Sequence, residues 1–441
     1  VYAVRQAPTL ARNLRNRLLG RPLRNYRPQR RFLSLVSLGD RRAAADRGWF
    51  TASGAWVWRW KDRIDREFMA RFDDMPEVMV AELDRLPEPG GEAGQIPCGG
   101  CGAKVGADTL SRVLGRLSLR YPAHCRREDL GDDVSLIPAG VGGQGDPVAI
   151  AQSIDVLRAL VDDPWIMGRI AANHAMSDLF ASGARPVSAL ACITLPFAGA
   201  ALLERELEQL LAGALHEFSA VDCRLTGGHS LQTAELTVGF TVNGVPIDAA
   251  AGLLPKRGLR PGDNLVLTRA LGTGTLFAAH MRLLADGRHI AHAIQGMLRS
   301  NAEAARIAVT HGASACTDIT GFGLAGHLQE MLGEHQAARI DLAAIPLLPG
   351  ADQSLAAGIH SSMHAANAAL KDRVALSAQP AGSGHDILFD PQTAGGLLIG
   401  VDARGAASLC SALHAAGDEQ AAIIGEVLDN GGAGRASLIV E

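Results

Sequence analysis

The sequence has few aromatic residues, no long apolar run and only a small excess of acidic over basic residues. Aromatic residues make up 4% of the 441 residues, so few side chains are available as stacking platforms for nucleic-acid bases. The net charge of −4 gives the chain no electrostatic attraction for nucleic acid. No apolar run approaches the ~18 residues of a membrane-spanning helix. We therefore expect no nucleic-acid partner and no membrane span.

Cysteine is also scarce, and its pattern makes a poor disulfide framework. The cysteines are odd in number and scattered along the chain. The seven are Cys98, Cys101, Cys125, Cys192, Cys223, Cys316 and Cys410. This pattern and the lack of an apolar secretory core in the N-terminus predict a reducing, cytoplasmic location. Glycine, in contrast, accounts for 50 residues, which favours close backbone packing and turns whose N–H groups cradle phosphate.

The N-terminal segment differs in composition from the rest of the chain. Residues 1–31 contain nine arginines and no acidic residue, and four of the five tryptophans follow. Residues 61–69 mix both charge signs and predict a helix. This composition suits an Arg-rich solvated face with a Trp-anchored helix, a membrane-surface element or a soluble docking surface. Because the chain begins at Val1, we expect a fragment or a processed product.

Beyond the N-terminal segment, strand-like runs alternate with Ala- and Leu-rich helical patterns. A run at 148–151 precedes a helix expected near 168–182, and strands are expected at 236–242 and 265–268. The last expected strand covers 396–401. Such alternation predicts two α/β domains. The expected boundaries are an N-terminal segment at 1–86, a Pro- and Gly-rich linker at 87–94, and domains at 95–255 and 256–441.

A glycine-rich loop carries two cysteines and a lysine. Three glycines surround Cys101, and Lys104 follows three residues later. A lysine at that spacing can hold a thiolate and also face a phosphate. Cys98 and Cys101 alone do not make a zinc site, because no second pair has metal spacing. A thioredoxin-like redox pair would need a preceding strand, where this chain has a linker. A flexible loop with incidental thiols remains an equally good interpretation.

Several aspartates follow strand-like runs or adjoin glycines. They are Asp132, Asp133, Asp155, Asp178 and Asp318. Mg²⁺ takes hard oxygen ligands and usually bridges carboxylates to substrate phosphates. Each aspartate alone is more often a cap or turn residue, so only their convergence in space would indicate a metal site.

Glycine-rich segments at 226–230, 271–274, 320–323 and 392–396 resemble turns that bind phosphate through backbone N–H groups. None has the Lys-Ser/Thr of a P-loop. His229 in the first of these segments is more often a satisfied polar residue than a catalytic one.

Taken in order, these motifs closely resemble selenophosphate synthetase over residues 95–441. The matching segments are 100–104, 131–133, 153–155, 168–173, 177–181, 227–230, 317–324 and 390–396. The resemblance implies an α/β (α+β) two-domain fold of the aminoimidazole-ribonucleotide-synthetase type. The N-terminal domain of that fold dimerises through a β-barrel. The implied reaction converts ATP, hydrogen selenide and water to selenophosphate, AMP and phosphate.

The same resemblance assigns roles to residues. Cys101 and Lys104 occupy the catalytic positions, and the magnesium positions are Asp133, Asp178 and Asp318. The implied nucleotide contacts are Lys104, Leu130, Gly131, Asp132, Asp155, Asp178, Gly227, Gly228 and His229. Many members carry a second cysteine where this chain has Ala103, which leaves a two-thiol mechanism in doubt. The implied cofactor is Mg²⁺, with ATP and selenide as substrates, a homodimer as the assembly and a selenium-delivery protein as a further partner.

The first 75 or so residues resemble the C-terminal tail of NADH-dehydrogenase-type flavoproteins. The similar stretches are residues 1–8 and 24–29. The Gly-rich nucleotide-binding segments of such flavoproteins are absent, so we expect no flavin on this fragment. The segment is expected to dock a flavoprotein module or a membrane surface. Other enzymes of the implied fold, such as aminoimidazole ribonucleotide synthetase, thiamine-monophosphate kinase and the hydrogenase-maturation dehydratase, are alternatives, and so is a catalytically silent docking subunit.

Overall fold

The structure is a computed structural model of the whole chain. It describes residues 2–28, 32–73, 99–100, 112–113, 115–116, 118–119, 133–139, 148–376, 384–430 and 437–441. The chain divides into two compact units. One comprises residues 1–95 with 198–202, and the other comprises residues 96–197 with 203–441.

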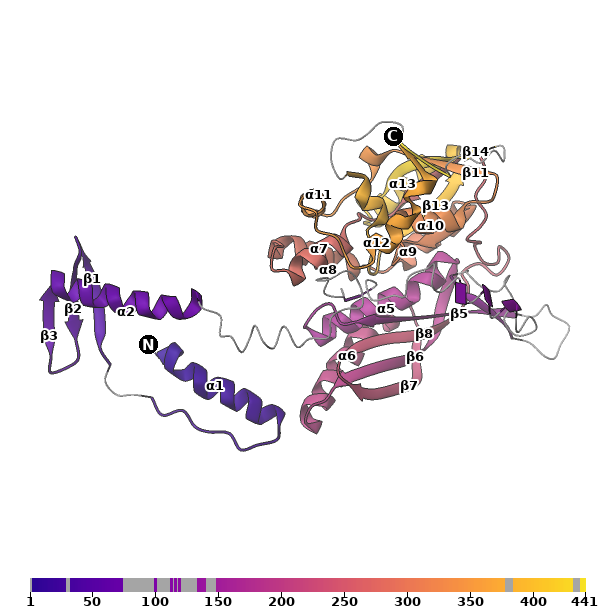
Figure 1. Cartoon of the computed structure of the whole chain (residues 1–441). Coiled ribbons are helices and arrows are strands. Elements are labelled where there is room, and N and C mark those ends of the chain that lie inside the picture. Colours follow the sequence, from indigo (N-terminus) through magenta and orange to yellow (C-terminus); the bar gives the residue numbers. More distant parts are fainter. Residues whose placement is uncertain are drawn as a thin grey trace. The chain divides into compact units, whose positions relative to one another are not determined.

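The N-terminal unit contains two helices and a small antiparallel sheet, drawn in indigo in Figure 1. Helix α1 (Tyr2–Leu18) precedes the strands β1 (Ser34–Gly39), β2 (Arg42–Asp46) and β3 (Thr51–Gly54), and helix α2 (Ala55–Asp73) follows them. The helix expected at 61–69 is therefore confirmed, whereas the sheet has no counterpart among the sequence-based expectations. Its core is formed by Ala43, Ala45 and Val57. So small an apolar cluster gives this unit little independent stability.

The larger unit begins with a five-stranded sheet in the order β4-β5-β8-β6-β7. Its strands are β4 (Ser135–Ala139), β5 (Val148–Arg158), β6 (Ala184–Pro196), β7 (Arg224–Thr233) and β8 (Thr237–Pro246). Helix α5 (Pro164–Ala181) connects β5 to β6, and helix α6 (Ala200–Ala220) connects β6 to β7. Figure 1 shows α5 between the sheet and the C-terminal helices.

Helix α5 is the expected helix near 168–182, and its start has a clear local cause. The Asp163 carboxylate accepts a hydrogen bond from the Ile166 N–H at 3.0 Å, and Pro164 occupies the first turn. Both features favour a helix N-terminus. Most of the helix is buried on all sides, because it contacts β5, β6 and β8 as well as β10, α8 and α9 of the following sheet and helices. Polar residues on α5 are thereby held in a low-dielectric environment.

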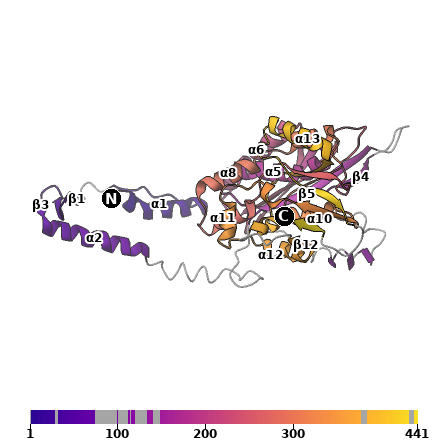
Figure 2. The same ribbon diagram turned by 90° about the horizontal axis from the view of Figure 1, so that it is seen from above.

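The C-terminal part is built on a seven-stranded mixed sheet in the order β10-β13-β9-β14-β11-β15-β12. Its strands are β9 (Asp263–Leu267), β10 (Ala315–Asp318), β11 (Gln336–Ile340), β12 (Val374–Leu376), β13 (Leu397–Asp402), β14 (Ala422–Asp429) and β15 (Leu438–Val440). The longer helices around it are α7 (Thr273–Met281), α8 (Gly287–Met297), α9 (Ala302–Thr310), α10 (Gly323–Met331) and α13 (Ala403–Ala415). The view from above in Figure 2 shows α8, α10 and α13 among the helices of this part.

Two expectations from the sequence are wrong. The run at 396–401 is not the last strand, because β14 and β15 follow it and pair with β9 and β11. The segment 226–230 is not a turn but part of β7, which pairs with a bulged stretch of β6. Gly228 is required there for close approach, since a Cβ at this position would lie 2.3 Å from the Ala191 carbonyl oxygen. The predicted strands at 236–242 and 265–268 are confirmed as β8 and β9.

The outer face of the five-stranded sheet exposes apolar side chains. Ile154 and Val156 of β5, Leu190 of β6 and Leu231 of β7 are all more than 40% exposed. Four aliphatic side chains on one sheet face form a patch of the kind found at protein–protein interfaces.

In the described part of the chain, no helix is long and apolar enough to cross a membrane.

The division into units predicts that removing residues 1–90 leaves a folded protein. The larger unit holds both extended apolar cores, so we expect its melting temperature to stay within a few degrees of that of the full chain. The ATP-dependent activity implied by the resemblance should also persist. Differential scanning calorimetry and a turnover assay check both points. A truncated protein that is folded but inactive, or that unfolds at a much lower temperature, would contradict this prediction.

Candidate active site

Three aspartates from distant parts of the sequence meet in one pocket of about 420 Å³. Asp133 precedes β4, Asp178 lies on α5, and Asp318 is the last residue of β10. One carboxylate oxygen from each lies within 4.8 Å of the others. These are the three residues that the resemblance assigns to magnesium. Their convergence is the observation that the sequence alone could not supply.

The charge of Asp178 is strongly destabilised in this pocket. Burial raises the pKa of its carboxyl group well above the usual range, and the negative charges of Asp318, Asp155 and Asp133 raise it further. A hydrogen bond from the Ser153 hydroxyl at 2.5 Å opposes this shift only in part. A bound cation would relieve the same repulsion. Three carboxylates with this geometry suit a hard divalent ion such as Mg²⁺.

Lys256 supplies the positive charge nearest to Asp133. Its Nζ lies 2.5 Å from Asp133 Oδ1 and 2.8 Å from Glu330 Oε2. Burial disfavours the ammonium ion, but the two carboxylates outweigh this effect and raise the pKa of Lys256 above its ordinary value. The Thr317 hydroxyl donates to Asp133 Oδ2 at 3.0 Å. Lys256 therefore neutralises the charge of Asp133. Asp178 and Asp318 lie close to each other in the same pocket.

Asp155 lies on the β5 wall of the pocket, beside Gln152 and Ser153. The buried His174 on α5 has its Nε2 3.7 Å from Asp155 Oδ1. Since the Ala394 N–H donates to His174 Nδ1 at 3.2 Å, the neutral ring carries its proton on Nε2, toward Asp155. The histidine thus links the β5 wall to the loop before β13.

Another part of the lining comes from α10 and the residues just before it. Thr320, Phe322, His327 and Glu330 line the pocket there. The Thr320 N–H donates to His327 Nε2 at 3.1 Å, and the rings of Phe322 and His327 lie 5.6 Å apart. This wall offers an apolar ring and polar groups next to the carboxylates, a mixture that suits a nucleotide.

Not all predicted site residues are found at this pocket. Asp133, Asp155, Asp178 and Asp318 line it. Gly227, Gly228 and His229 lie on the exposed strand β7 and are absent from the described lining of the pocket. The remaining predicted site residues fall outside the described residues: Cys101, Lys104, Leu130, Gly131 and Asp132.

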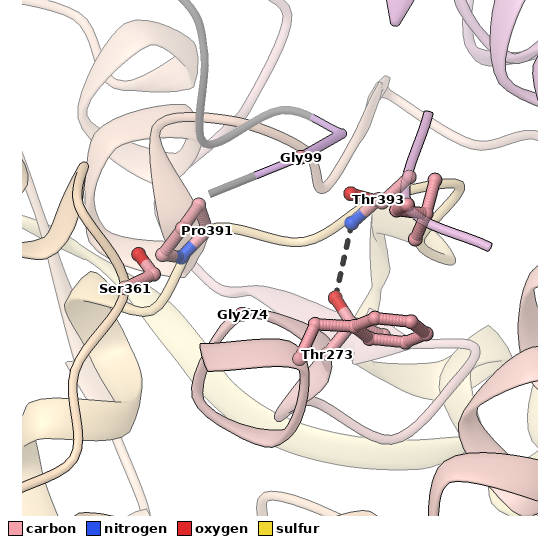
Figure 3. A pocket seen from close by; sticks show the side chains of 8 residues that line it. Gly99, Thr273, Gly274, Ser361, Pro391 and Thr393 are labelled. Carbon is pink, nitrogen blue, oxygen red and sulfur yellow. Dashed lines mark hydrogen bonds between the residues drawn. The ribbon is translucent and has the colours of Figure 1, made fainter. Parts of the chain in front are cut away.

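The two described residues before Cys101 are docked against the fold. The Gly100 N–H donates to the Arg158 carbonyl at the end of β5, with a distance of 3.0 Å. Gly99 lines a small cavity with Ser361, Pro391 and Thr393, among others, as Figure 3 shows. Gly100 has φ +60°, and a Cβ there would lie 2.5 Å from the Thr393 hydroxyl. Only glycine combines this backbone conformation with so close an approach.

The glycine turn at 271–274 does not present free N–H groups to a phosphate. Gln392 Oε1 accepts from the N–H groups of Gly272 and Thr273 at 2.9 and 3.0 Å, and Asp390 Oδ2 accepts from the Gly274 N–H at 3.1 Å. Thr273 also accepts from the Thr393 N–H, the bond dashed in Figure 3. Burial raises the pKa of Asp390 to about 7, although hydrogen bonds from Gln392 and the turn oppose the shift. This turn therefore anchors the 390–393 segment.

The comparisons first define the class. The chain matches the model of the AIR synthase related protein N-terminal domain over residues 131–245 and that of the C-terminal domain over residues 260–436. Two solved structures share the fold. A ThiL structure complexed with AMPPCP and TMP has a TM-score of 0.52 at 16% identity, covering 76% of this chain and 93% of that one. The hydrogenase maturation protein HypE in complex with ATP has a TM-score of 0.52 at 18% identity, covering 75% and 91%. The expected two-domain α/β fold is confirmed.

Curated relatives then define the family. A selenide, water dikinase of Geobacter metallireducens is 36% identical over 332 residues, covering 72% of this chain and 90% of the relative. One from a Geobacter species is 37% identical over 349 residues, covering 75% and 97%. The chain belongs to the selenide, water dikinase family, as its motifs predicted.

Sequence reasoning missed the residues that support the aspartates. Lys256, His174 and Thr317 contact predicted site residues, but only Thr317 lies in a segment that the motifs had singled out. Lys256 lies 123 positions from Asp133, and Thr317 lies 184 positions from it. No periodicity or short spacing could have paired them. The only available signal was Thr317's place directly before Asp318 in a segment already singled out.

The raised pKa of Asp178 predicts a stability change with a definite sign. Because the folded-state pKa lies above the unfolded value, the ionised carboxylate destabilises the cation-free fold increasingly as pH rises from the unfolded pKa through the folded one. Asp178→Asn should therefore raise the melting temperature at pH 7 in EDTA, by roughly 2–4 °C for each kcal/mol relieved. Adding Mg²⁺ should stabilise the wild type more than the variant.

Differential scanning fluorimetry at pH 5 and pH 7, with and without Mg²⁺, measures these shifts. The exposed Glu208→Gln removes one negative charge on α6, outside the lining of the acidic pocket, and serves as the control. A destabilised Asp178→Asn in EDTA would contradict the account.

Proposed function

We propose that this chain catalyses the selenide, water dikinase reaction, in which ATP, hydrogen selenide and water give selenophosphate, AMP and phosphate. The observation that carries the proposal is the meeting of Asp133, Asp178 and Asp318 in one pocket, in a chain of this family. We expect ATP to bind in this pocket as a magnesium complex. Bound Mg²⁺ would neutralise phosphate charge during phosphoryl transfer.

The described residues have distinct tasks in this proposal. The carboxylates of Asp133, Asp178 and Asp318 hold the cation, and Lys256 keeps the charge of Asp133 balanced before the cation arrives. Asp155, oriented by His174, faces the nucleotide on the β5 wall. Positioning of this kind supplies most of the catalysis in phosphoryl transfer.

Selenide must meet the nucleotide in the absence of competing water. By resemblance, Cys101 and Lys104 carry the selenium and face the phosphates, respectively. The docking of Gly99 and Gly100 at Arg158 and Thr393 fixes the chain immediately before Cys101. A loop anchored at this point can close over the pocket and exclude water, which would otherwise accept the phosphoryl group first.

Assembly and location complete the proposal. The exposed apolar face formed by Ile154, Val156, Leu190 and Leu231 suits a homodimer that pairs two five-stranded sheets. We place the enzyme in the cytoplasm, with selenium arriving as selenide or from a delivery protein. We propose that the N-terminal segment, which resembles the tail of a flavoprotein, docks a flavoprotein module or a membrane surface.

The nearest alternative is another ATP-dependent enzyme of the same fold, of the aminoimidazole ribonucleotide synthetase or thiamine-monophosphate kinase type. The ThiL likeness, at 16% identity, speaks for the fold alone. The Cys101 and Lys104 pair in the glycine-rich loop favours the selenium chemistry.

The two functions predict different products. With Mg-ATP and selenide under anaerobic conditions, we expect AMP and phosphate in equal amounts together with selenophosphate. Omission of selenide should lower AMP formation strongly. Chromatography of the nucleotides with a coupled phosphate assay measures both. ADP as the stable final product would favour an ordinary kinase and overturn the proposal.

The loop predicts unequal roles for its two cysteines. Cys101→Ser should reduce selenide-dependent turnover to background, because only Cys101 has the spacing to Lys104 that the family motif requires. Cys98→Ser is the matched control and should keep activity within a few-fold of wild type. Steady-state AMP release measures both variants, with ATP binding followed separately. Equal losses in the two variants would indicate a two-thiol mechanism.

A further inference from the structure

A second cluster of metal-ligating side chains lies outside the acidic pocket. It contains His360, His364 at the start of the short helix α12 (His364–Asn367), and His385 and Asp386 in the 3₁₀ helix η5 (Gly384–Phe389). None of these residues lines the acidic pocket. The ligand atoms of His360, His364 and Asp386 all lie within 4.8 Å of one another. This is the same compactness that the three aspartates show.

The three histidines direct the same ring nitrogen at one carboxylate. The Nε2 atom of His360 lies 3.3 Å from Asp386 Oδ2. The Nε2 atoms of His364 and His385 lie 3.8 and 3.4 Å from Asp386 Oδ1. Atoms bound about 2.0–2.1 Å from a tetrahedral zinc ion lie about 3.3 Å from each other. The spacing already present is close to that of a zinc coordination shell.

Hydrogen bonding alone does not explain this convergence. His360 Nε2 is within hydrogen-bond distance of Asp386, whereas His364 Nε2, at 3.8 Å, is too far from it for a hydrogen bond. The rings of His360 and His364 are nevertheless stacked, with centroids 4.1 Å apart and an interplanar angle of 21°. The two rings therefore lie side by side and both face one carboxylate.

Burial keeps the central histidine in the form that binds metals. The His364 side chain is 8% exposed. Burial lowers its pKa to about 4, and the neighbouring His360 lowers it further, although Asp386 acts in the opposite direction. A neutral imidazole is the ligand form of histidine. The low exposure of His364 thus favours the form of the ring that binds an ion.

One charged neighbour competes with an ion at this position. Lys371 Nζ lies 3.2 Å from Asp386 Oδ1 and 5.5 Å from the centre of the Phe389 ring. Its side chain is 47% exposed, so it can move into solvent when an ion takes its place. Burial raises the pKa of Asp386, but the bond from Lys371 and the nearby histidines outweigh it, so the net shift is downward. Asp386 is thus an ionised ligand.

We propose that His360, His364 and Asp386 form a binding site for a borderline transition-metal ion of the Zn²⁺ class, with His385 as a fourth ligand. Two or three imidazoles and one carboxylate suit Zn²⁺ and not Mg²⁺. The Nδ1 atoms of His364 and His385 have no hydrogen-bond partner in the described structure. Missing outer-shell partners weaken a metal site by about 10–100-fold, so binding is of intermediate strength and reversible.

The ion would connect residues 360–364 with η5, next to the cavity that Gly99 lines. Ser361 follows His360 directly and lines the cavity that holds Gly99, together with Pro391 beyond η5, as labelled in Figure 3. Asn367 at the end of α12 donates to the carbonyls of Gly321 and Phe389 at 3.0 Å each. A metal clip between residues 360–364 and η5 would therefore stiffen the wall of the cavity that Gly99 lines.

The test is Zn²⁺ binding to the full chain after treatment with EDTA. The background carries Cys98→Ser and Cys101→Ser, so that the thiols cannot bind the ion, and excess Mg²⁺ fills the acidic pocket. Competition with a chromogenic chelator gives the affinity and stoichiometry. We expect one Zn²⁺ per chain that Mg²⁺ does not displace, and at least a 10-fold loss of affinity in His364→Gln and in Asp386→Asn. Co²⁺ in place of Zn²⁺ should give the intense visible absorption of a tetrahedral site.

The control is His292→Gln, which removes an exposed histidine whose Nδ1 contacts the Arg288 carbonyl, and it should leave binding unchanged. Circular dichroism checks that each variant is folded. Should His364→Gln not fold, the half-exposed His360→Gln gives the same comparison. Unchanged Zn²⁺ binding in the folded cluster variants, no bound Zn²⁺ in the wild type, or displacement of Zn²⁺ by Mg²⁺ would each overturn the proposal.

Discussion

Mutual repulsion among the buried carboxylates of Asp133, Asp178 and Asp318 is the constraint on which the rest of the site depends. Charges within 4.8 Å of one another repel by on the order of 3 kcal/mol per pair at an effective dielectric constant of ~20. The fold tolerates this cost for two reasons. Lys256 neutralises the charge of Asp133, and the raised pKa of Asp178 lets its carboxyl group keep a proton at a higher pH than an ordinary aspartate does. In the proposed function, a divalent cation that arrives with the nucleotide would replace both arrangements.

Helix α5 keeps Asp178 in place against that repulsion. A Cβ on Gly168 would lie 1.9 Å from the Leu210 carbonyl oxygen of α6, and one on Gly213 would lie 2.0 Å from that of Trp165, so the two helices pack in direct backbone contact. On the other side, Asn301 donates to the Ser177 hydroxyl at 2.9 Å and to the Gly395 carbonyl at 3.0 Å. The helix is therefore fixed to both sheets, and Asp178 on it cannot move away from Asp133 and Asp318.

The sequence singled out the three aspartates that meet in one pocket, but it did not predict how they are held. Asp133, Asp178 and Asp318 could be selected because each belongs to a family motif. Lys256 could not, since a pairing over 123 positions arises only from the tertiary fold. Local propensity also misread two regions. The glycines at 227–228 indicated a turn, whereas pairing of β7 with the bulged β6 requires glycine within a strand. The strands β14 and β15 follow helix α13 and were missed because their register is set by β9 and β11.

The most direct test of this account is the titration of the Asp178 carboxyl carbon by ¹³C NMR. The protein would be labelled at aspartate, and the resonance would be assigned by its absence in Asp178→Asn. The account predicts a pKa well above the usual aspartate value in cation-free protein, because of burial and the three neighbouring carboxylates. It also predicts a return to or below the usual value when Mg²⁺ and a non-hydrolysable ATP analogue are added. A pKa that is ordinary without the cation, or that does not respond to it, would contradict the central claim that these carboxylates form one cation site.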